Sequence, residues 1–178
     1  MRQEWQVKVR PKALAENVIQ GEKYRITMLT QGLIRLEYSE DGCFEDRATQ
    51  SVWNRDFSKT EFRCKETPDS LEIFTSRIHL VYDKQKFSPN GLSVQVLGQY
   101  INHGSIWHYG QDFQNLGGTA RTLDEADGAI PLEKGIMGRV GFSLLDDSKS
   151  LVLTEDGWIE PRKSKGVDLY FWGYVHDY

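Results

Sequence analysis

Apolar and polar residues alternate along most of the chain, which is the pattern of a β-strand with one buried face. The alternating runs are short, and Gly, Asn, Asp or Ser separates them, as in the turn signals at 31–32 and 76–77. We expect strands at 24–28, 33–38, 71–75, 78–82, 92–97, 141–145, 151–154 and 167–172. Short strands at this spacing predict an all-β fold, an antiparallel sandwich or barrel.

Two stretches depart from this alternation. Residues 12–17, entered through Pro11, predict a short helix that is as small as a single turn. Residues 110–138 hold six glycines and almost no alternation. A connection of this length is usually functional or disordered, and we interpret it as a long, ordered, irregular loop. No internal repeat, low-complexity tract or linker is visible, so residues 1–178 predict one domain.

Composition and charge exclude several classes of protein. The chain has 178 residues, enough to bury a core, and its net charge of −4 with scattered basic residues disfavours a nucleic-acid partner. Its one basic cluster, 162–165, is interpreted as a solvated turn. No apolar run approaches the roughly 20 residues that span a bilayer. Residues 1–6 lack the order of a secretory signal, so we expect a cytoplasmic protein with no membrane partner.

Cysteine and histidine spacing indicates no metal site and no cofactor. Cys43 and Cys64 match no ligand spacing and are interpreted as reduced structural thiols, with a disulfide left open. The four histidines show no metal pattern, and His103 and His108 are interpreted as surface residues. The stretch 116–121 lacks the spacing and the Lys-Ser/Thr ending of a phosphate loop.

The acidic residues predict turns and strand exteriors rather than a catalytic pair. A glycosidase needs two carboxylates that flank the scissile bond. Asp146-Asp147-Ser148 instead predicts a hairpin turn, and 155–157 predicts another. We therefore expect no catalytic residue in this chain.

One stretch before and inside the long loop has a composition that suits a sugar, because flat rings stack on C–H faces while amides and carboxylates take hydroxyls. It comprises Trp107, His108, Tyr109, Gln111, Asp112, Phe113 and Gln114. Trp107 and Phe113 are the predicted stacking residues. The alternative is that these aromatic residues cap the core of the sandwich. Asp124, Glu125, Asp127 and Arg139 would project polar groups from the same connection.

Five motifs in order resemble the amino-terminal domain of family 31 glycoside hydrolases. They are Asn115 to Asp124, Asp127 to Glu133, Gly138 to Ser148, Leu153 to Trp158 and Asp168 to Tyr174. The first hundred residues fit more loosely. The resemblance implies a galactose-mutarotase-like antiparallel β-sandwich that packs on a catalytic (β/α)8 barrel. It implies a retaining α-glucosidase acting on α-linked oligosaccharides, with both catalytic aspartates beyond Tyr178, in a barrel absent from this chain.

The same resemblance implies where the sandwich meets substrate. In the family, a loop of this domain reaches over the barrel mouth and presents an acidic residue in the leaving-group subsite. By position, Asp127 is the first candidate and Asp124 the second. Many relatives have Ser-Arg-Asp-Gly where this chain has Gly138 to Gly141, so their acidic position is Val140 here. Arg139 is expected either to contact ligand or to pair with nearby carboxylates.

Two other functions stay open at this point. One is a stand-alone carbohydrate-binding sandwich. The other is a mutarotase-like epimerase, which needs a His with a Glu, and His79 or His108 with Glu133 would have to serve. Nothing in the spacing of these residues favours that pair.

Docking of a barrel would leave an exposed apolar patch on the isolated chain and would favour self-association. Trp158, Trp172 and Tyr174 are its predicted members. The sequence after the last strand, where Asp177 suits a helix N-cap, is what a longer protein would show.

Overall fold

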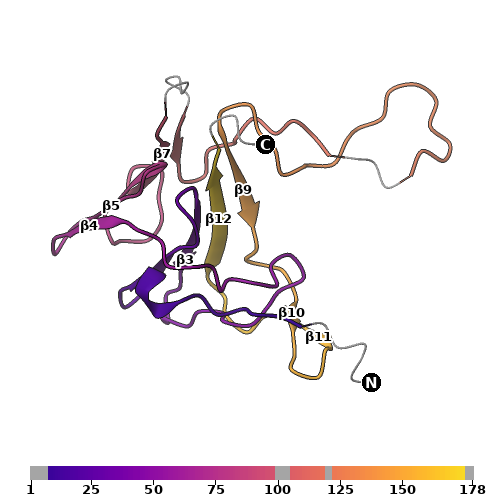
Figure 1. Cartoon of the computed structure of the whole chain (residues 1–178). Helices are drawn as coiled ribbons and strands as arrows, with labels where there is room; N and C mark the ends of the chain where they lie inside the picture. The colour runs from indigo at the N-terminus through magenta and orange to yellow at the C-terminus, as the bar shows by residue number, and fades with distance from the viewer. Residues whose placement is uncertain (1–7, 99–104, 119–121, 175–178) are drawn as a thin grey trace.

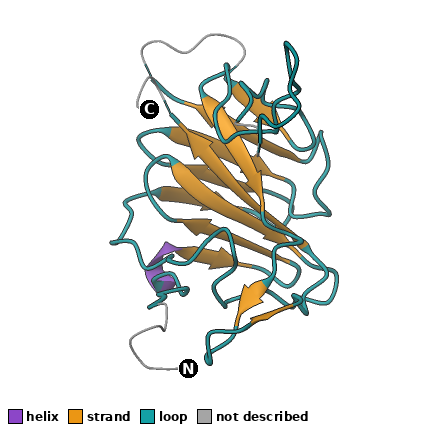
Figure 2. Cartoon of the chain, turned by 90° about the vertical axis from the view of Figure 1, so that its right-hand side faces the viewer, coloured by secondary structure: helices purple, strands orange, loops and turns teal. Residues whose placement is uncertain are grey.

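A computed structural model describes residues 8–98, 105–118 and 122–174, and these form two antiparallel β-sheets that pack face to face. Twelve strands lie within the described residues, and Figures 1 and 2 show their arrangement. One 3₁₀ turn, Ala15–Asn17, precedes the first strand. The described residues contain no helix that is long and apolar enough to cross a membrane.

The first sheet has the order β1-β2-β3-β12-β9. Its strands are β1 (Val18–Gln20), β2 (Tyr24–Met28), β3 (Leu33–Tyr38), β12 (Val167–Gly173) and β9 (Phe142–Asp146). β12 lies between β3 and β9 and pairs with both, so that Tyr170 lies opposite Arg35 on one side and Leu145 on the other. The last predicted motif therefore inserts into a sheet begun by the amino-terminal strands.

The second sheet is a meander in the order β4-β5-β6-β7-β8. Its strands are β4 (Arg63–Glu66), β5 (Leu71–Phe74), β6 (Ile78–Tyr82), β7 (Leu92–Val96) and β8 (Ile106–His108). A separate two-stranded ribbon joins β10 (Val152–Leu153) to β11 (Ile159–Glu160).

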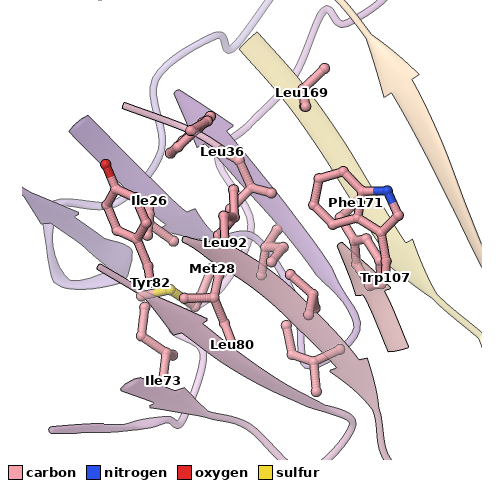
Figure 3. Close-up of a cluster of buried hydrophobic side chains, with 14 of the residues drawn as sticks. Ile26, Met28, Leu36, Ile73, Leu80, Tyr82, Leu92, Trp107, Leu169 and Phe171 are labelled. Atoms are coloured by element: carbon pink, nitrogen blue, oxygen red, sulfur yellow. The ribbon is translucent and has the colours of Figure 1, made fainter. Parts of the chain in front are cut away.

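The core lies between the two sheets (Figure 3). Because side chains alternate across a strand, each strand of the first sheet sends its apolar residues inward, as Ile26, Leu36 and Phe171 show. The second sheet contributes Leu80 and Trp107 to the same core, and both side chains are fully buried. Burial of these residues is the main term that holds the sheets together.

The opposite, outer face of the first sheet is polar over β2, β3 and the start of β12. It carries Arg25, Thr27, Arg35, Glu37, Asp168 and Tyr170. Two amino-terminal segments cover it. The chain at Arg10 runs parallel to the chain at Asn54, and the Arg55 amide donates to the Arg10 carbonyl at 2.7 Å.

The structure confirms the predicted all-β antiparallel sandwich with a long irregular connection. All eight predicted strands are present within a few residues, and the predicted helix is the single 3₁₀ turn. The sequence missed β1, β4, β8 and β11. β4 is exposed at all four positions, so it carries no alternation to detect. His103 and Asp177 lie outside the described residues.

Candidate functional site

A cleft of about 550 Å³ opens at the root of the long connection, residues 110–138. One wall is the end of β8 and the turn after it, with Tyr109, Gln111 and Asp112. The other wall is the returning chain at Lys134 together with Asp146 at the end of β9. Five of the seven residues that the sequence singled out for a sugar line this cleft, namely Trp107, Tyr109, Gln111, Asp112 and Phe113. The structure therefore brings most of that stretch together.

The two predicted stacking rings are buried. Trp107 is 1% exposed and Phe113 is 8% exposed, and Trp107 donates Nε1–H to the Gln111 carbonyl at 3.1 Å. The Trp107 ring lies 5.8 Å from Phe171 and 6.2 Å from Tyr109, measured between centroids. The reason is the alternation of β8, which points its middle residue into the sandwich. These rings belong to the core, as the alternative interpretation held, and only the half-buried Tyr109 offers a ring edge to the cleft.

The polar groups of the cleft suit hydroxyl binding better than bond cleavage. Burial raises the pKa of the Tyr109 phenol, and the charge of Asp146 raises it further, so the hydroxyl remains a hydrogen-bond donor at neutral pH. Asp112 and Asp146 are both exposed, whereas a general acid in a glycosidase is held in an enclosed, apolar environment. Nothing in the cleft places two carboxylates in that kind of setting.

Asn115 braces the two legs of the long connection, which run side by side. We call residues 113–118 and 133–139 the stalk, and residues 122–131 the tip. The Asn115 side chain accepts from the amides of Gly117 and Gly135 at 2.8 and 2.9 Å and donates to the Gly135 carbonyl at 2.6 Å. A Cβ on Gly135 would lie 2.6 Å from the Gly117 carbonyl oxygen. The two legs therefore approach each other closely only because position 135 is a glycine, opposite Gly117 of the first resembling motif.

Tyr174 closes the root of the stalk. Its hydroxyl accepts from the Gly138 amide at 2.7 Å and donates to the Gly138 carbonyl at 2.6 Å, with the Phe142 carbonyl at 3.2 Å. Gly138 is itself buried, and the chain packs so closely there that an added Cβ would lie 2.4 Å from the Phe113 carbonyl oxygen. The motif strand β12 therefore leads directly into the residue that holds the loop.

The tip carries the predicted substrate acids, away from the cleft. Asp124 and Asp127 are exposed and do not line the cleft. Figure 1 shows the long connection leaving the sheets as a wide excursion. Glu125 and Gly128 have positive φ values of 60° and 90°, which turn the chain beside each acid.

Arg139 and Val140 lie at the other end of the connection. Arg139 is exposed, and no described carboxylate lies within ion-pair distance of it, so the pairing role is not formed in this structure. Val140, where relatives carry the acid, is half-buried and packs against the core. An aspartate at this position would meet apolar neighbours.

The sequence missed a buried ion network on the outer face of the first sheet. Arg35 donates to both oxygens of Asp168 at 2.8 and 2.7 Å. Glu37 lies 3.0 Å from Arg35, and Arg25 donates to it at 2.6 and 2.9 Å. Because these residues come from three strands, and Asp168 lies 133 residues after Arg35, no local spacing signals the network.

Burial and charge act in opposite directions on the two carboxylates. Burial alone would raise the pKa of Asp168, but hydrogen bonds and charge from Arg35 and Arg162 outweigh it and lower that pKa. Burial is the larger effect on Glu37 and raises its pKa against the pull of Arg25 and Arg35. The network is therefore a structural device in which each charge depends on its partners.

One interpretation from the sequence is wrong here, and another missed the burial of a side chain. Arg162 was placed in a solvated turn, yet its side chain is 5% exposed and donates to Asp168 at 2.6 Å and to Asp147 at 3.1 Å. Asp147 does start a turn, since Ser150 N donates to its carbonyl at 3.1 Å. Its carboxylate is nevertheless fully buried and accepts from Thr49 Oγ1 at 2.9 Å. Both side chains lie in short polar stretches of the sequence, and those stretches do not reveal that partners distant in the chain bury them.

The remaining histidines and the cysteines form no reactive centre. His79 stacks on Phe74 with centroids 4.1 Å apart, and His108 lies with Nδ1 3.0 Å from the Pro89 carbonyl oxygen. Neither these histidines nor Glu133 lines the cleft, so the His–Glu pair that an epimerase needs is not formed there. Cys43 and Cys64 are free and exposed, and no described group of His, Cys, Asp and Glu is arranged to hold a metal ion.

An apolar groove of about 390 Å³ lies on the outer face of β12 and β9. Phe57, Ile136, Leu145 and Trp172 are among its lining residues. Of the predicted patch members, Trp172 therefore lines an apolar surface. Trp158 is 69% exposed but belongs to the turn between β10 and β11, and Tyr174 is buried, so the predicted grouping is wrong.

Comparison with known proteins finds likeness among solved structures. No protein-family model matches the chain, and no curated protein does. Among solved structures, a family 31 dextranase from Flavobacterium johnsoniae, in complex with glucose, matches over 92% of this chain at 16% identity with a TM-score of 0.47. The match covers 24% of the dextranase, so the chain spans about a quarter of that protein's length. A likeness of this size does not extend to activity or substrate.

Proposed function

We propose that this chain is the accessory β-sandwich domain of a family 31 glycoside hydrolase of the retaining α-glucosidase type. The ordered set of five resembling motifs between residues 115 and 174 carries the proposal. The antiparallel sandwich is the architecture that this resemblance implies. The motif residues also have linked roles, since Asn115 and Gly117 form the stalk together with Gly135, and Tyr174 anchors it.

The tip of the long connection supplies the contact with substrate. Asp127, or Asp124 beside it, would accept hydroxyl hydrogen bonds from the sugar in the leaving-group subsite. An acid that positions a sugar must be held by a braced support, because a loose loop loses orientation. The stalk is such a support, with its three hydrogen bonds to one asparagine side chain.

Hydrolysis itself would be the work of a barrel in the same protein. Within the described residues, the buried acids all accept a hydrogen bond from an arginine or a threonine, and the other acids are exposed or partly exposed. Neither setting gives a free acid and nucleophile pair. The barrel would dock on this chain, and the apolar groove at Trp172 is the surface that suits it.

Asp127→Ala in the full-length product of the reading frame tests the tip. Loss of a hydrogen bond to a charged group is worth about 1.5–3 kcal/mol, so kcat/KM for an α-linked oligosaccharide should fall by about tenfold or more. An aryl α-glucoside, which lacks the second sugar, should be affected much less. Asp156→Ala, an exposed acid in the β10–β11 turn, is the matched control. Equal loss on both substrates would refute the subsite role.

A second function has its own supporting observation. The cleft at Tyr109, Gln111 and Asp112 mixes a ring edge with polar groups, which suits a stand-alone carbohydrate-binding sandwich. Titration of the 178-residue chain with α-linked glucose oligosaccharides, followed by Trp fluorescence, separates the two. Saturable binding that Asp112→Ala abolishes would favour the binding module. Absence of binding favours the accessory domain.

A further inference from the structure

A small enclosed cavity of about 70 Å³ lies beneath the segments that cover the outer face of the first sheet. The sheet contributes Arg25 and Thr27 from β2 and Arg35 from β3. The covering segments contribute Asp46 and Arg55. The space exceeds what one buried water needs, which is of the order of 10–15 Å³. Three arginine side chains thus line one small cavity.

Two of the three arginines have their charge balanced by carboxylates. Arg25 lies 2.6 Å from Glu37 and 2.7 Å from the half-exposed Asp46. Arg35 lies 2.7 Å from Asp168 and 3.0 Å from Glu37. Their positive charge is therefore met within the network.

Arg55 differs from both, although it is 1% exposed. Its Nε donates to the Tyr170 hydroxyl at 2.5 Å, and its Nη1 donates to the carbonyls of Pro11 and Arg47 at 2.9 and 3.0 Å. Nη2 is buried without a hydrogen-bond partner among the described residues. No described carboxylate lies within ion-pair distance of this guanidinium.

Tyr170 does not supply the missing negative charge. Burial raises the pKa of its phenol to about 12, against the lowering effect of Arg35 and Arg55. The hydroxyl therefore stays neutral at physiological pH. A buried cation that meets only neutral acceptors carries an uncompensated desolvation penalty of several kcal/mol. Water would add an acceptor but no charge.

We propose that this cavity binds a small monovalent anion of the halide class, chloride under ordinary conditions, beside Arg55, Arg35 and Arg25. The anion balances Arg55 and ties the covering segments at Pro11 and Asp46 to the sheet. The volume excludes large organic anions such as gluconate. The site is separate from the proposed glycosidase function and does not depend on it.

Unfolding measured at constant ionic strength tests the site, with sodium chloride exchanged stepwise for sodium gluconate. A ligand that binds only the folded state lowers the apparent unfolding constant by the factor 1 + [L]/Kd. We expect about a tenfold decrease when chloride reaches roughly nine times its Kd. Arg55→Met, which keeps the length of the side chain and removes its charge, should lose the chloride dependence. Arg10→Met is the matched control, because Arg10 pairs with Asp56 on the surface, and it should keep that dependence.

Crystals of the unmodified protein soaked in bromide give a readout that does not require the variant to fold. An anomalous peak within hydrogen-bond distance of Arg55 or Arg35 is expected. Equal stability in chloride and gluconate, or a cavity without an anomalous peak, would overturn the proposal. Equal stabilisation by sulfate would overturn the halide assignment, because it would indicate a general salt effect.

Discussion

The Tyr174 hydroxyl is the strongest single link between the sheet and the long connection, so Tyr174→Phe is the most informative substitution for the loop. The ring and its packing stay in place, so the change creates almost no cavity. What is lost is the pair of hydrogen bonds to the Gly138 amide and carbonyl at 2.7 and 2.6 Å.

The structure sets the magnitude of the effect. Both Gly138 groups are enclosed, so water cannot readily replace the hydroxyl. A buried donor or acceptor left unpaired costs about 1–3 kcal/mol, and we expect a loss of free energy of unfolding of about 2 kcal/mol on the same basis. Tyr24→Phe is the control, because Tyr24 is also buried but its hydroxyl meets only Glu66, at 3.4 Å. It should cost less than about 0.5 kcal/mol.

Urea denaturation monitored by fluorescence measures the free energy of unfolding, and amide hydrogen exchange measures the local effect. Exchange at the amides of Gly138 and Leu116 should accelerate in Tyr174→Phe, since the Leu116 amide donates to the Met137 carbonyl within the stalk. The reasoning is refuted if the two Tyr→Phe variants are equally stable and Gly138 exchanges at its original rate.

Three further predictions follow from the burial and charges. Asp168→Asn should cost about 3–5 kcal/mol, because it removes an anion from a buried network. Since folding lowers the pKa of Asp168, its stabilisation is present above the unfolded value near 4 and is lost as pH falls through the folded pKa. The stability of Asp168→Asn should therefore fall less steeply in acid, as denaturation from pH 7 to 3 would show, and an unchanged profile would contradict this. Trp107→Ala should lower the free energy of unfolding, measured by urea denaturation, by about 3–5 kcal/mol. The control His108→Ala should lower it by less than about 0.5 kcal/mol. Similar losses in the two variants would argue against a core role for the tryptophan. The isolated chain should self-associate in light scattering at high concentration, and Phe57→Ser in the apolar groove should reduce it; a monodisperse monomer would count against this.

Local patterning predicted the architecture because each strand carries its own alternation. In Tyr24 to Met28, apolar residues occupy every second position, so the sequence alone predicts a strand there. The same signal is lacking where a strand is short or solvated, as in Arg63 to Glu66. The strand order of the first sheet depends on pairing between β3 and β12, which are more than a hundred residues apart, and no local pattern encodes that pairing.

The candidate site was predictable in composition but not in orientation. Most of the stretch from Trp107 to Gln114 does line a cleft, yet Trp107 and Phe113 are buried, and the position of Trp107 in β8 directs its ring inward. Arg162 and Asp147 show the same limit, since each resembles a surface residue in the sequence, whereas in the structure Arg162 pairs with Asp168 and Asp147 accepts from Thr49. Burial of charge depends on partners from other strands.

The decisive experiment for the proposed accessory role is hydrolysis of an aryl α-glucoside by the full product of the reading frame, measured beside the 178-residue chain. We expect turnover by the full product and none by the chain alone. Turnover by the chain alone would contradict this role, because the chemistry would then lie among residues that the structure places in turns and in the ion network.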